Sequence, residues 1–183
     1  MEGNSLQAPW RMDYIRSLSK GDDAQCFLCA AANATSDAER RDRLVLWTTD
    51  HSVVLINRYP YTNGHILVAP RAHKAEFEDL SDDEQLDLAK QSTRVIQLLK
   101  RALSPQGFNL GTNLGRCAGA GLPGHLHQHV VPRWAGDTNF MSVVGDIRVV
   151  PQAMSQLYEE LMHVLPSLSE KRSDERRDAE NRR

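Results

Sequence analysis

The segment Gly124-His125-Leu126-His127-Gln128-His129-Val130-Val131-Pro132 places three histidines at alternate positions. Successive side chains of a strand point to opposite faces, so this spacing puts the three imidazoles on one face, roughly 7 Å apart. Leu126 and Val130 then point to the other face, as a hydrophobic core requires. A solvated polar strand face is the alternative, but it would use three of only seven histidines in the chain. Because imidazole transfers protons, attacks electrophiles and binds metals at neutral pH, we favour a reactive site.

The composition limits the classes of protein to which the chain can belong. Its 183 residues, 40% of them hydrophobic and 25% charged, predict one soluble domain with tails. The net charge of −2 gives no electrostatic basis for a nucleic-acid or membrane partner. No apolar run approaches the length of a membrane span, and residues 1–10 lack the layout of a secretory signal. The sequence therefore predicts a cytoplasmic protein with no nucleic-acid and no membrane partner.

The patterning predicts an α+β domain. Strands are expected at residues 44–47, 52–57, 65–70 and 108–114 and at the histidine segment. One helix is expected from the capping box of Ser81 and Glu84 to about Leu103, and a second from Pro151. Antiparallel strands with two segregated helices give the α+β class.

Outside those elements the sequence predicts irregular segments and divides the chain into three parts. Residues 30–43 are predicted to be a loop or short helix. The predicted boundaries are an irregular segment at residues 1–20, the domain at residues 21–166 and a charged, disordered or frayed tail at residues 167–183.

Glycines crowd the approach to the histidine segment, at Gly111, Gly115, Gly119, Gly121 and Gly124. Glycine lets the backbone approach a ligand and point N–H groups at it, an arrangement that suits phosphate. A merely flexible loop is the alternative. The spacing matches neither the dinucleotide-binding nor the Walker pattern, so a different kind of phosphate site is required.

The middle histidine, His127, is the predicted nucleophile. A histidine attacks phosphorus only when it is neutral and one ring nitrogen has a free lone pair. A backbone carbonyl can hold the proton on the other nitrogen. Since His127 has an imidazole on each side, one neighbour can orient it and the other can bind the phosphoryl oxygens. The intermediate would be a covalent nucleotidyl-histidine.

The pair in Cys26-Phe27-Leu28-Cys29 has the spacing of a metal knuckle or a redox pair. Two sulfurs separated by two residues can converge on one tetrahedral zinc, which needs two further ligands. His51, on the turn between the first two strands, is well placed to be one of them. A redox pair or two buried thiols are the alternatives. Cys117, alone in the glycine-rich loop, is expected to be incidental.

At these residues the chain resembles the histidine triad (HIT) superfamily of nucleotide hydrolases and transferases, whose signature is three histidines alternating with apolar residues. The resemblance extends to the upstream segment Asn57-Arg58-Tyr59-Pro60 and to Gly64-His65-Ile66-Leu67-Val68-Ala69-Pro70. Similarity to the bacterial diadenosine tetraphosphate phosphorylase branch rests on Trp10-Arg11-Met12-Asp13-Tyr14, Gly107-Phe108-Asn109-Leu110-Gly111, Asn113-Leu114-Gly115 and His129-Val130-Val131-Pro132-Arg133-Trp134. It covers roughly residues 10–154. The resemblance implies a five-stranded antiparallel sheet and a homodimer with a joint sheet.

The resemblance also implies roles for individual residues. His127 matches the nucleophile, His129 the histidine that stabilises the transferred phosphate, and His65 a fourth histidine near the phosphate. For His65 the alternative is a strand histidine satisfied by a backbone carbonyl. The resemblance further implies three nucleotide- or phosphate-binding residues: Asn57 at the ribose, Leu55 beside the base and Asn113 near the phosphates. Gly121, just before the triad, is also predicted to contact phosphate, but only through its backbone N–H.

The resemblance to zinc-bearing members implies the ligand set Cys26, Cys29, His51 and His125. Four protein ligands close the coordination shell, so the zinc would be structural. It would fix the segment that carries His127, two residues from a ligand.

The leading prediction is cleavage of nucleoside polyphosphates, with diadenosine polyphosphates as favoured substrates, by hydrolysis or phosphorolysis. Two features depart from the family pattern: Gln128 fills a normally apolar position, and residues 121–124 lack a Ser, Thr or Gln before the triad. The second departure favours the alternative of a zinc-ordered nucleotide-binding module without turnover. Uridylyl transfer to hexose phosphates is disfavoured because those enzymes carry Gln where this chain has His129.

Overall fold

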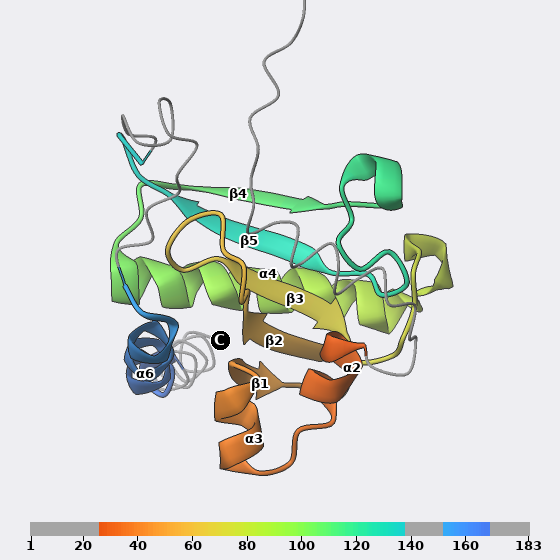
Figure 1. Ribbon diagram of the computed structural model, residues 1–183, viewed down its shortest axis with the longest axis horizontal. Helices are drawn as coiled ribbons and strands as arrows, with labels where there is room; N and C mark the ends of the chain where they lie inside the picture. The colour runs from red at the N-terminus through yellow and green to blue at the C-terminus, as the bar shows by residue number, and fades with distance from the viewer. Residues whose placement is uncertain (1–25, 138–151, 169–183) are drawn as a thin grey trace, which may run out of the picture.

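The computed structural model describes residues 26–137 and 152–168, which form one sheet with helices on both faces (Figure 1). The predicted irregular segment at residues 1–20, the residues Trp10–Tyr14 and Pro151, and the tail beyond residue 168 lie outside the described residues. The strands are β1 (Val45–Thr48), β2 (Ser52–Ile56), β3 (Ile66–Pro70), β4 (Gly107–Thr112) and β5 (Gln128–Arg133).

The sheet has the order β1-β2-β3-β5-β4, and every pair of neighbours is antiparallel. The predicted five-stranded antiparallel sheet is therefore confirmed. The pairs Leu55–Leu67, Leu67–His129 and Gly111–His129 align one residue from each of β2, β3, β5 and β4 across the sheet. Since aligned residues share a face, His129 lies on the face of Leu55 and Leu67.

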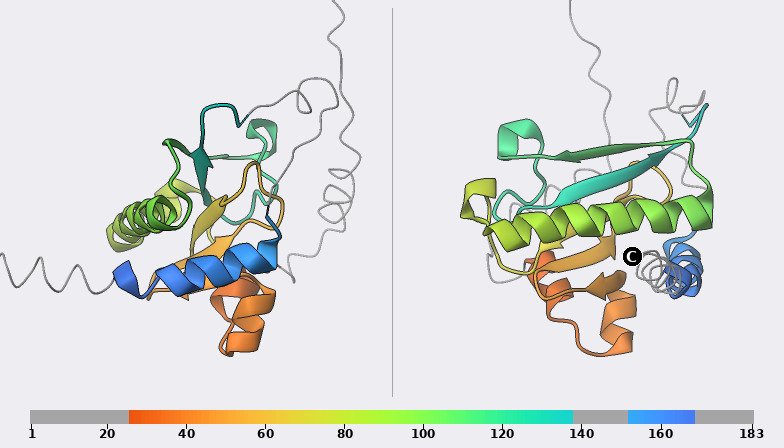
Figure 2. Two further views of the ribbon diagram at one scale, coloured as in Figure 1. Left: turned by 90° about the vertical axis from the view of Figure 1, so that its left-hand side faces the viewer. Right: turned by 180° about the vertical axis from the view of Figure 1, so that it is seen from behind.

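Two long helices cover the opposite face (Figure 2). Helix α4 (Asp82–Leu103) begins at the predicted capping box, in which Ser81 and Glu84 hydrogen-bond reciprocally. Helix α6 (Met154–Val164) packs beside it. Their apolar residues form the main core with the sheet residues Val54, Ile56, Ile66, Val68 and Val130.

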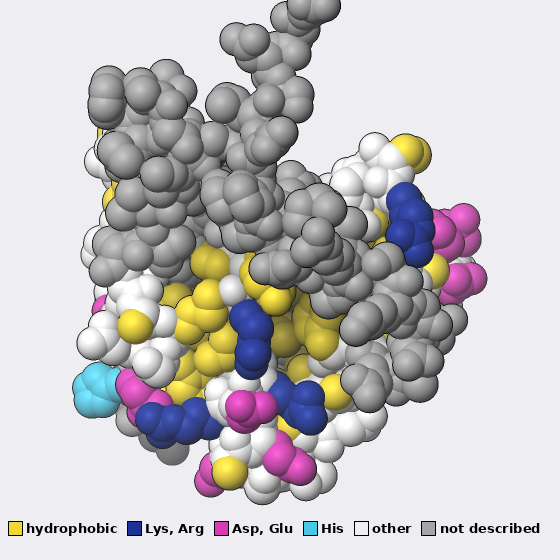
Figure 3. Space-filling view, viewed as in Figure 1, with side chains coloured by type: hydrophobic (Ala, Val, Ile, Leu, Met, Phe, Trp, Pro, Cys, Tyr) yellow, Lys and Arg dark blue, Asp and Glu magenta, His cyan; other side chains and the backbone are white. Residues whose placement is uncertain are grey.

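The face that carries His129 has a second, smaller apolar cluster. It joins helix α2 (Phe27–Ala32) to Val53, Leu55, Leu67 and Ala69. Figure 3, viewed as Figure 1, shows hydrophobic side chains gathered on this face, with Lys or Arg side chains among them and along its lower edge.

Three further short helices lie in the connecting segments. Helix α3 (Asp37–Asp42) follows α2 and begins at a second capping box. Of the loop or short helix predicted for residues 30–43, the structure therefore has the short helix. The short 3₁₀ helices are η2 (Phe77–Asp79) and η3 (Arg116–Ala118).

The histidine segment is only partly a strand. β5 begins at Gln128, so His125 and His127 precede the hydrogen-bonded ladder. The predicted sidedness is confirmed, because Leu126 and Val130 are buried in the main core. Gln128 also faces that side, where the hydroxyl of Ser92 on α4 donates a hydrogen bond to its Oε1 atom.

One further observation concerns the predicted boundary at residue 166, and another concerns membrane-spanning helices. Leu168 is buried in the main core, so the packed region extends two residues beyond the predicted boundary at residue 166. Within residues 26–137 and 152–168, no helix has both the length and the apolar character needed to cross a bilayer.

Candidate functional site

The ring of His127 is held by the backbone of its own segment. Its Nδ1 atom lies 2.8 Å from the carbonyl oxygen of His125. A carbonyl only accepts, so Nδ1 carries the proton and donates it, and Nε2 of the neutral ring keeps its lone pair. Burial lowers the pKa of His127, and the side chain is only 6% exposed. His127 is therefore a neutral imidazole with a lone pair on Nε2, and its role as nucleophile stays a prediction.

A chain of hydrogen bonds fixes the tautomer of His129. The backbone N–H of Tyr61 donates to Nδ1 of His65 at 3.1 Å, so the proton of His65 is on Nε2. That Nε2 lies 2.9 Å from Nδ1 of His129 and donates to it. Burial, and next to it the electrostatic interaction with the titratable ring of His127, lower the pKa of His129 to about 4. Neutral His129 therefore carries its single proton on Nε2.

The Nε2 atom of His129 is buried and has no hydrogen-bond partner among the described residues. Leaving a buried donor unsatisfied costs about 1–3 kcal/mol, and a ligand oxygen would remove that cost. The rings of His127 and His129 lie edge to face with centroids 5.0 Å apart. The ring that keeps a free lone pair thus lies beside the ring whose N–H group can bind an anionic oxygen.

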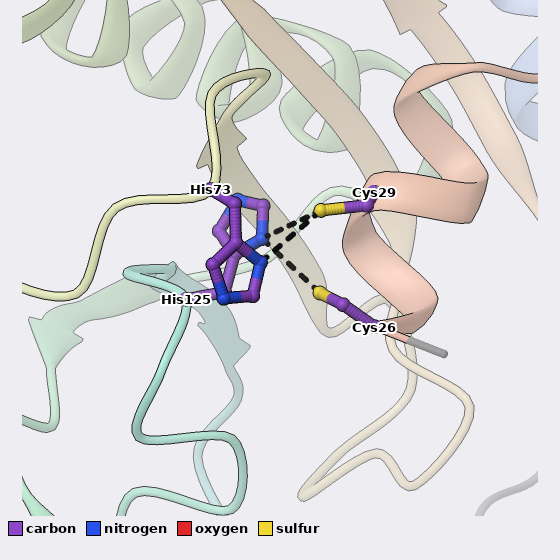
Figure 4. A group of neighbouring side chains, drawn as sticks. All are labelled: Cys26, Cys29, His73 and His125. Atoms are coloured by element: carbon purple, nitrogen blue, oxygen red, sulfur yellow. Dashed lines mark hydrogen bonds between the residues drawn. The ribbon is translucent and has the colours of Figure 1, made fainter. Parts of the chain in front are cut away.

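Four side chains from three separate segments converge at a second centre (Figure 4). The ligand atoms of Cys26, Cys29, His73 and His125 all lie within 4.8 Å of one another. Nδ1 of His125 lies 3.2 Å from the sulfur of Cys26 and 3.5 Å from that of Cys29. Nδ1 of His73 lies 3.2 Å from the sulfur of Cys29.

The chemistry of these four residues fits a tetrahedral metal ion. Nε2–H of His125 donates to the carbonyl oxygen of Pro70 at 2.8 Å, which leaves the Nδ1 lone pair directed at the sulfurs. Metal-binding histidines are commonly oriented in this way by a backbone carbonyl on the other nitrogen. Two thiolates and two imidazoles are a usual set for structural zinc, with ligand atoms about 3.5 Å apart.

Without a cation, the sulfur of Cys29 would stay protonated at neutral pH. Burial, followed by its interactions with Cys26, raises the pKa of the Cys29 thiol to about 11. Burial also lowers the pKa of His125 to about 4, so its ring is a neutral potential ligand. A bound divalent cation favours the thiolate and opposes the effect of burial.

The predicted ligand His51 is not in this group, and His73 occupies its place. His51 is exposed on the turn before β2, and the carbonyl oxygen of His51 accepts from the N–H of Arg71. Strand β3 therefore lies between His51 and the histidine segment, a separation of about 10 Å over two strand spacings. The loop after β3 carries His73 directly toward His125, so we correct the predicted ligand set at this position.

The predicted nucleotide-binding residues have different surroundings. The side-chain amide of Asn57 donates to Nδ1 of His65 at 3.2 Å, and its Oδ1 accepts from the N–H of Tyr59 at 3.0 Å. Leu55 is 3% exposed, within the second apolar cluster. In the loop before the triad, Asn113 donates to the carbonyl oxygen of Gly119 at 3.4 Å, and Gly121 is half-buried. Their contacts with a nucleotide stay predictions.

Comparison with known proteins identifies the family. Residues 38–136 match the HIT domain. The chain belongs to the HIT family. The HIT protein described here is 37% identical over 151 residues to a protein of Mycobacterium tuberculosis (strain H37Rv) named AP-4-A phosphorylase, covering 81% of this chain and 77% of the relative.

Solved structures of other HIT proteins have the same fold. A zinc-bound histidine triad family protein from Mycobacterium smegmatis matches with a TM-score of 0.64 and 23% identity, over 82% of this chain and 99% of its own. A protein from Sulfolobus tokodaii, named as a hypothetical histidine triad nucleotide-binding protein, matches with a TM-score of 0.61 and 25% identity, over 78% of this chain and 93% of its own.

Two residues of the site were missed by the sequence analysis. His73 lies in Arg71-Ala72-His73, just past the proline that closes β3. No signal within the segment could have found it, because its place depends on the pairing of β3 with β5, which brings the end of β3 to the start of the histidine segment. Tyr61 lies on the turn before β3, where its backbone holds His65, and an exposed aromatic residue gives no such signal in the sequence.

Proposed function

We propose that this HIT protein cleaves dinucleoside polyphosphates, with diadenosine tetraphosphate as the first substrate to test. The observation that carries the proposal is the pairing of a free Nε2 lone pair on His127 with an unsatisfied Nε2–H on His129. The name of the Mycobacterium tuberculosis relative, AP-4-A phosphorylase, supports the same substrate class.

In the proposed reaction, Nε2 of His127 attacks the phosphorus next to a nucleoside. The N–P bond forms as the bond from phosphorus to the bridging oxygen breaks, and the electron pair leaves with the rest of the phosphate chain. Nε2–H of His129 donates to a phosphoryl oxygen and stabilises the charge that develops there. Water or inorganic phosphate then attacks the nucleotidyl-His127 and releases the nucleotide.

His65 has a supporting role in this proposal. It is fully buried and contacts His129 through its Nε2. We therefore assign it to orienting His129, together with Asn57, instead of acting on the substrate as the sequence analysis predicts.

The experiment is incubation with diadenosine tetraphosphate, with and without inorganic phosphate, followed by product chromatography. Nucleoside diphosphate formed only with phosphate indicates a phosphorylase, and monophosphate formed without it indicates a hydrolase.

His127→Asn should lower kcat by at least about a thousandfold while nucleotide binding remains. His163→Asn, an exposed position on α6, is the matched control. Binding with no products from the unaltered protein would instead support the nucleotide-binding module.

We propose that Cys26, Cys29, His73 and His125 hold a structural zinc. The bound ion would tie α2 to the loop after β3 and to the segment that precedes His127. The test is elemental analysis of the purified protein, with chelation followed by thermal unfolding. Equimolar zinc and a lower Tm after chelation are expected, and a protein without bound metal that also gains no stability from added zinc would contradict the site.

We also propose a homodimer and a reducing, cytoplasmic location, as the sequence predicts. Strand β4 is an edge of the sheet within the described residues, and Leu110 on it is 46% exposed. Light scattering of the protein and of Leu110→Lys tests whether this edge joins two copies.

The free thiols of Cys26 and Cys29 support a reducing compartment, since only reduced sulfurs bind zinc.

A further inference from the structure

The ring of Tyr61 lies against the two hydrogen-bonded imidazoles of the site. Its centroid is 4.7 Å from that of His65 and 5.8 Å from that of His129, and the planes of Tyr61 and His129 differ by only 28°. Tyr61 is 42% exposed, whereas His65 is fully buried. The tyrosine ring therefore forms the outer layer and shields the imidazole pair from water.

The backbone of the same residue holds the first member of the pair. The N–H of Tyr61 donates to Nδ1 of His65, which in turn leaves Nε2–H of His65 to donate to His129. Tyr61 thus contacts this pair twice, once through its main chain and once through its ring. Only the ring contact can be removed by substitution without altering the main-chain donor.

We propose that Tyr61 is a positioning residue whose ring excludes water from the His65–His129 pair and keeps Nε2–H of His129 available to the phosphate. This inference rests on the proposed function. Tyr61 acts through the imidazoles and takes no part in bond making.

Removal of the ring should have a measurable electrostatic result. Burial is the first cause of the lowered pKa of His129, and His127 is the second. Within the described part of the chain, the rings of the titratable residues His65, His127 and Tyr61 lie against His129. If water replaces the ring, the pKa should rise from about 4 toward 6.5. Protonated His129 carries a proton on Nδ1 and can no longer accept from His65.

The experiment compares the full chain with Tyr61→Ala and Tyr61→Phe by NMR of ¹⁵N-labelled histidine and by turnover of diadenosine tetraphosphate. In Tyr61→Ala the titration midpoint of His129 should rise. Its kcat at pH 6 should fall on the order of tenfold relative to the unaltered protein, with a smaller loss at pH 8 and little change in KM. Tyr61→Phe keeps the ring and should restore both readouts. The imidazole signals of His163, on α6, serve as the internal reference.

An unchanged midpoint and tautomer of His129 in Tyr61→Ala would overturn the inference. If that variant does not fold, Tyr61→Leu replaces it, and there a midpoint equal to that of the unaltered protein would mean that apolar bulk, not the aromatic ring, is what matters. If the unaltered protein shows no turnover, the proposed function fails, but the NMR titration still decides the role of Tyr61.

Discussion

The backbone N–H of Leu126 donates a hydrogen bond of 2.7 Å to the carbonyl oxygen of Lys74. This bond joins the histidine segment to the loop that carries His73. The loop is held in turn by the start of α4, because Nζ of Lys74 lies 2.7 Å from Oε2 of Glu84, which also caps the helix at Ser81. One carboxylate therefore supports the helix start and the loop beside both centres.

We expect Glu84→Gln to lower the free energy of unfolding by about 1 kcal/mol at pH 7. The hydrogen bond from Lys74, and next the N–H of Ser81, lower the pKa of Glu84 below its ordinary value of 4.5. A lowered pKa stabilises the fold above pH 4.5, and this contribution is lost as the pH falls through the folded-state pKa. Urea unfolding at pH 7 and pH 3 measures it.

The difference between the unaltered protein and Glu84→Gln should therefore shrink at pH 3. Glu78→Gln, an exposed position on η2, is the control and should change stability little at either pH. An equal loss at both pH values would assign the effect to packing instead of charge.

Gly64→Ala should destabilise the protein by about 2–3 kcal/mol. Gly64 has a φ of +77°, and a Cβ atom there would lie 2.6 Å from Cδ1 of Leu103. Either the Leu103 side chain or the turn that carries Tyr61 and His65 would have to move, and the positive φ adds backbone strain. Thermal unfolding measures the loss, and Gly107→Ala is the control because a Cβ atom there meets nothing within 4 Å. Equal stability of the two variants would refute the close approach of the turn to α4.

His73→Ala should weaken zinc binding by at least about tenfold, while His51→Ala should leave it unchanged. The reason is that, of these two histidines, it is His73 whose ring nitrogen lies beside the cysteine pair, 3.2 Å from the sulfur of Cys29. Competition with a chromogenic chelator measures both affinities. The reverse order of effects would reinstate the ligand set implied by the sequence.

Ser92→Ala should lower the free energy of unfolding by about 1 kcal/mol, since it leaves Oε1 of Gln128 without its donor. Gln128→Leu should cost a similar amount, because the hydroxyl of Ser92, which is 4% exposed, then loses its acceptor. Replacing both with apolar residues should recover stability. A double-mutant cycle in urea tests this, and Thr93→Ala is the control. Purely additive losses would show that the two residues are not coupled.

Local patterns were readable from the sequence, and contacts across the sheet were not. The capping box of Ser81 and Glu84 and the sidedness of Leu126 and Val130 depend on spacing along a single element. The choice between His51 and His73 depends on which strand neighbours β5 and in which register. Nothing within either segment specifies that neighbour.

The link between His65 and His129 was also beyond the sequence. Both residues were predicted to act at the phosphate, because the resemblance places them near it. In the structure His65 contacts His129, and the backbone N–H of Tyr61 fixes the tautomer of His65. These contacts depend on how the segments pack, which residue spacing does not encode.

The two apolar clusters lie on opposite faces of the sheet, so protein engineering can change one face without changing the other. Substitutions that improve packing between α4 and α6 act on the face opposite His129. Thermal stability can therefore be increased there without changing the side chains of the site. Gln128 is the exception. Its side chain accepts a hydrogen bond from Ser92 on α4, while its main chain connects His127 to His129. A library that leaves this residue and its serine partner fixed would keep the two properties separable.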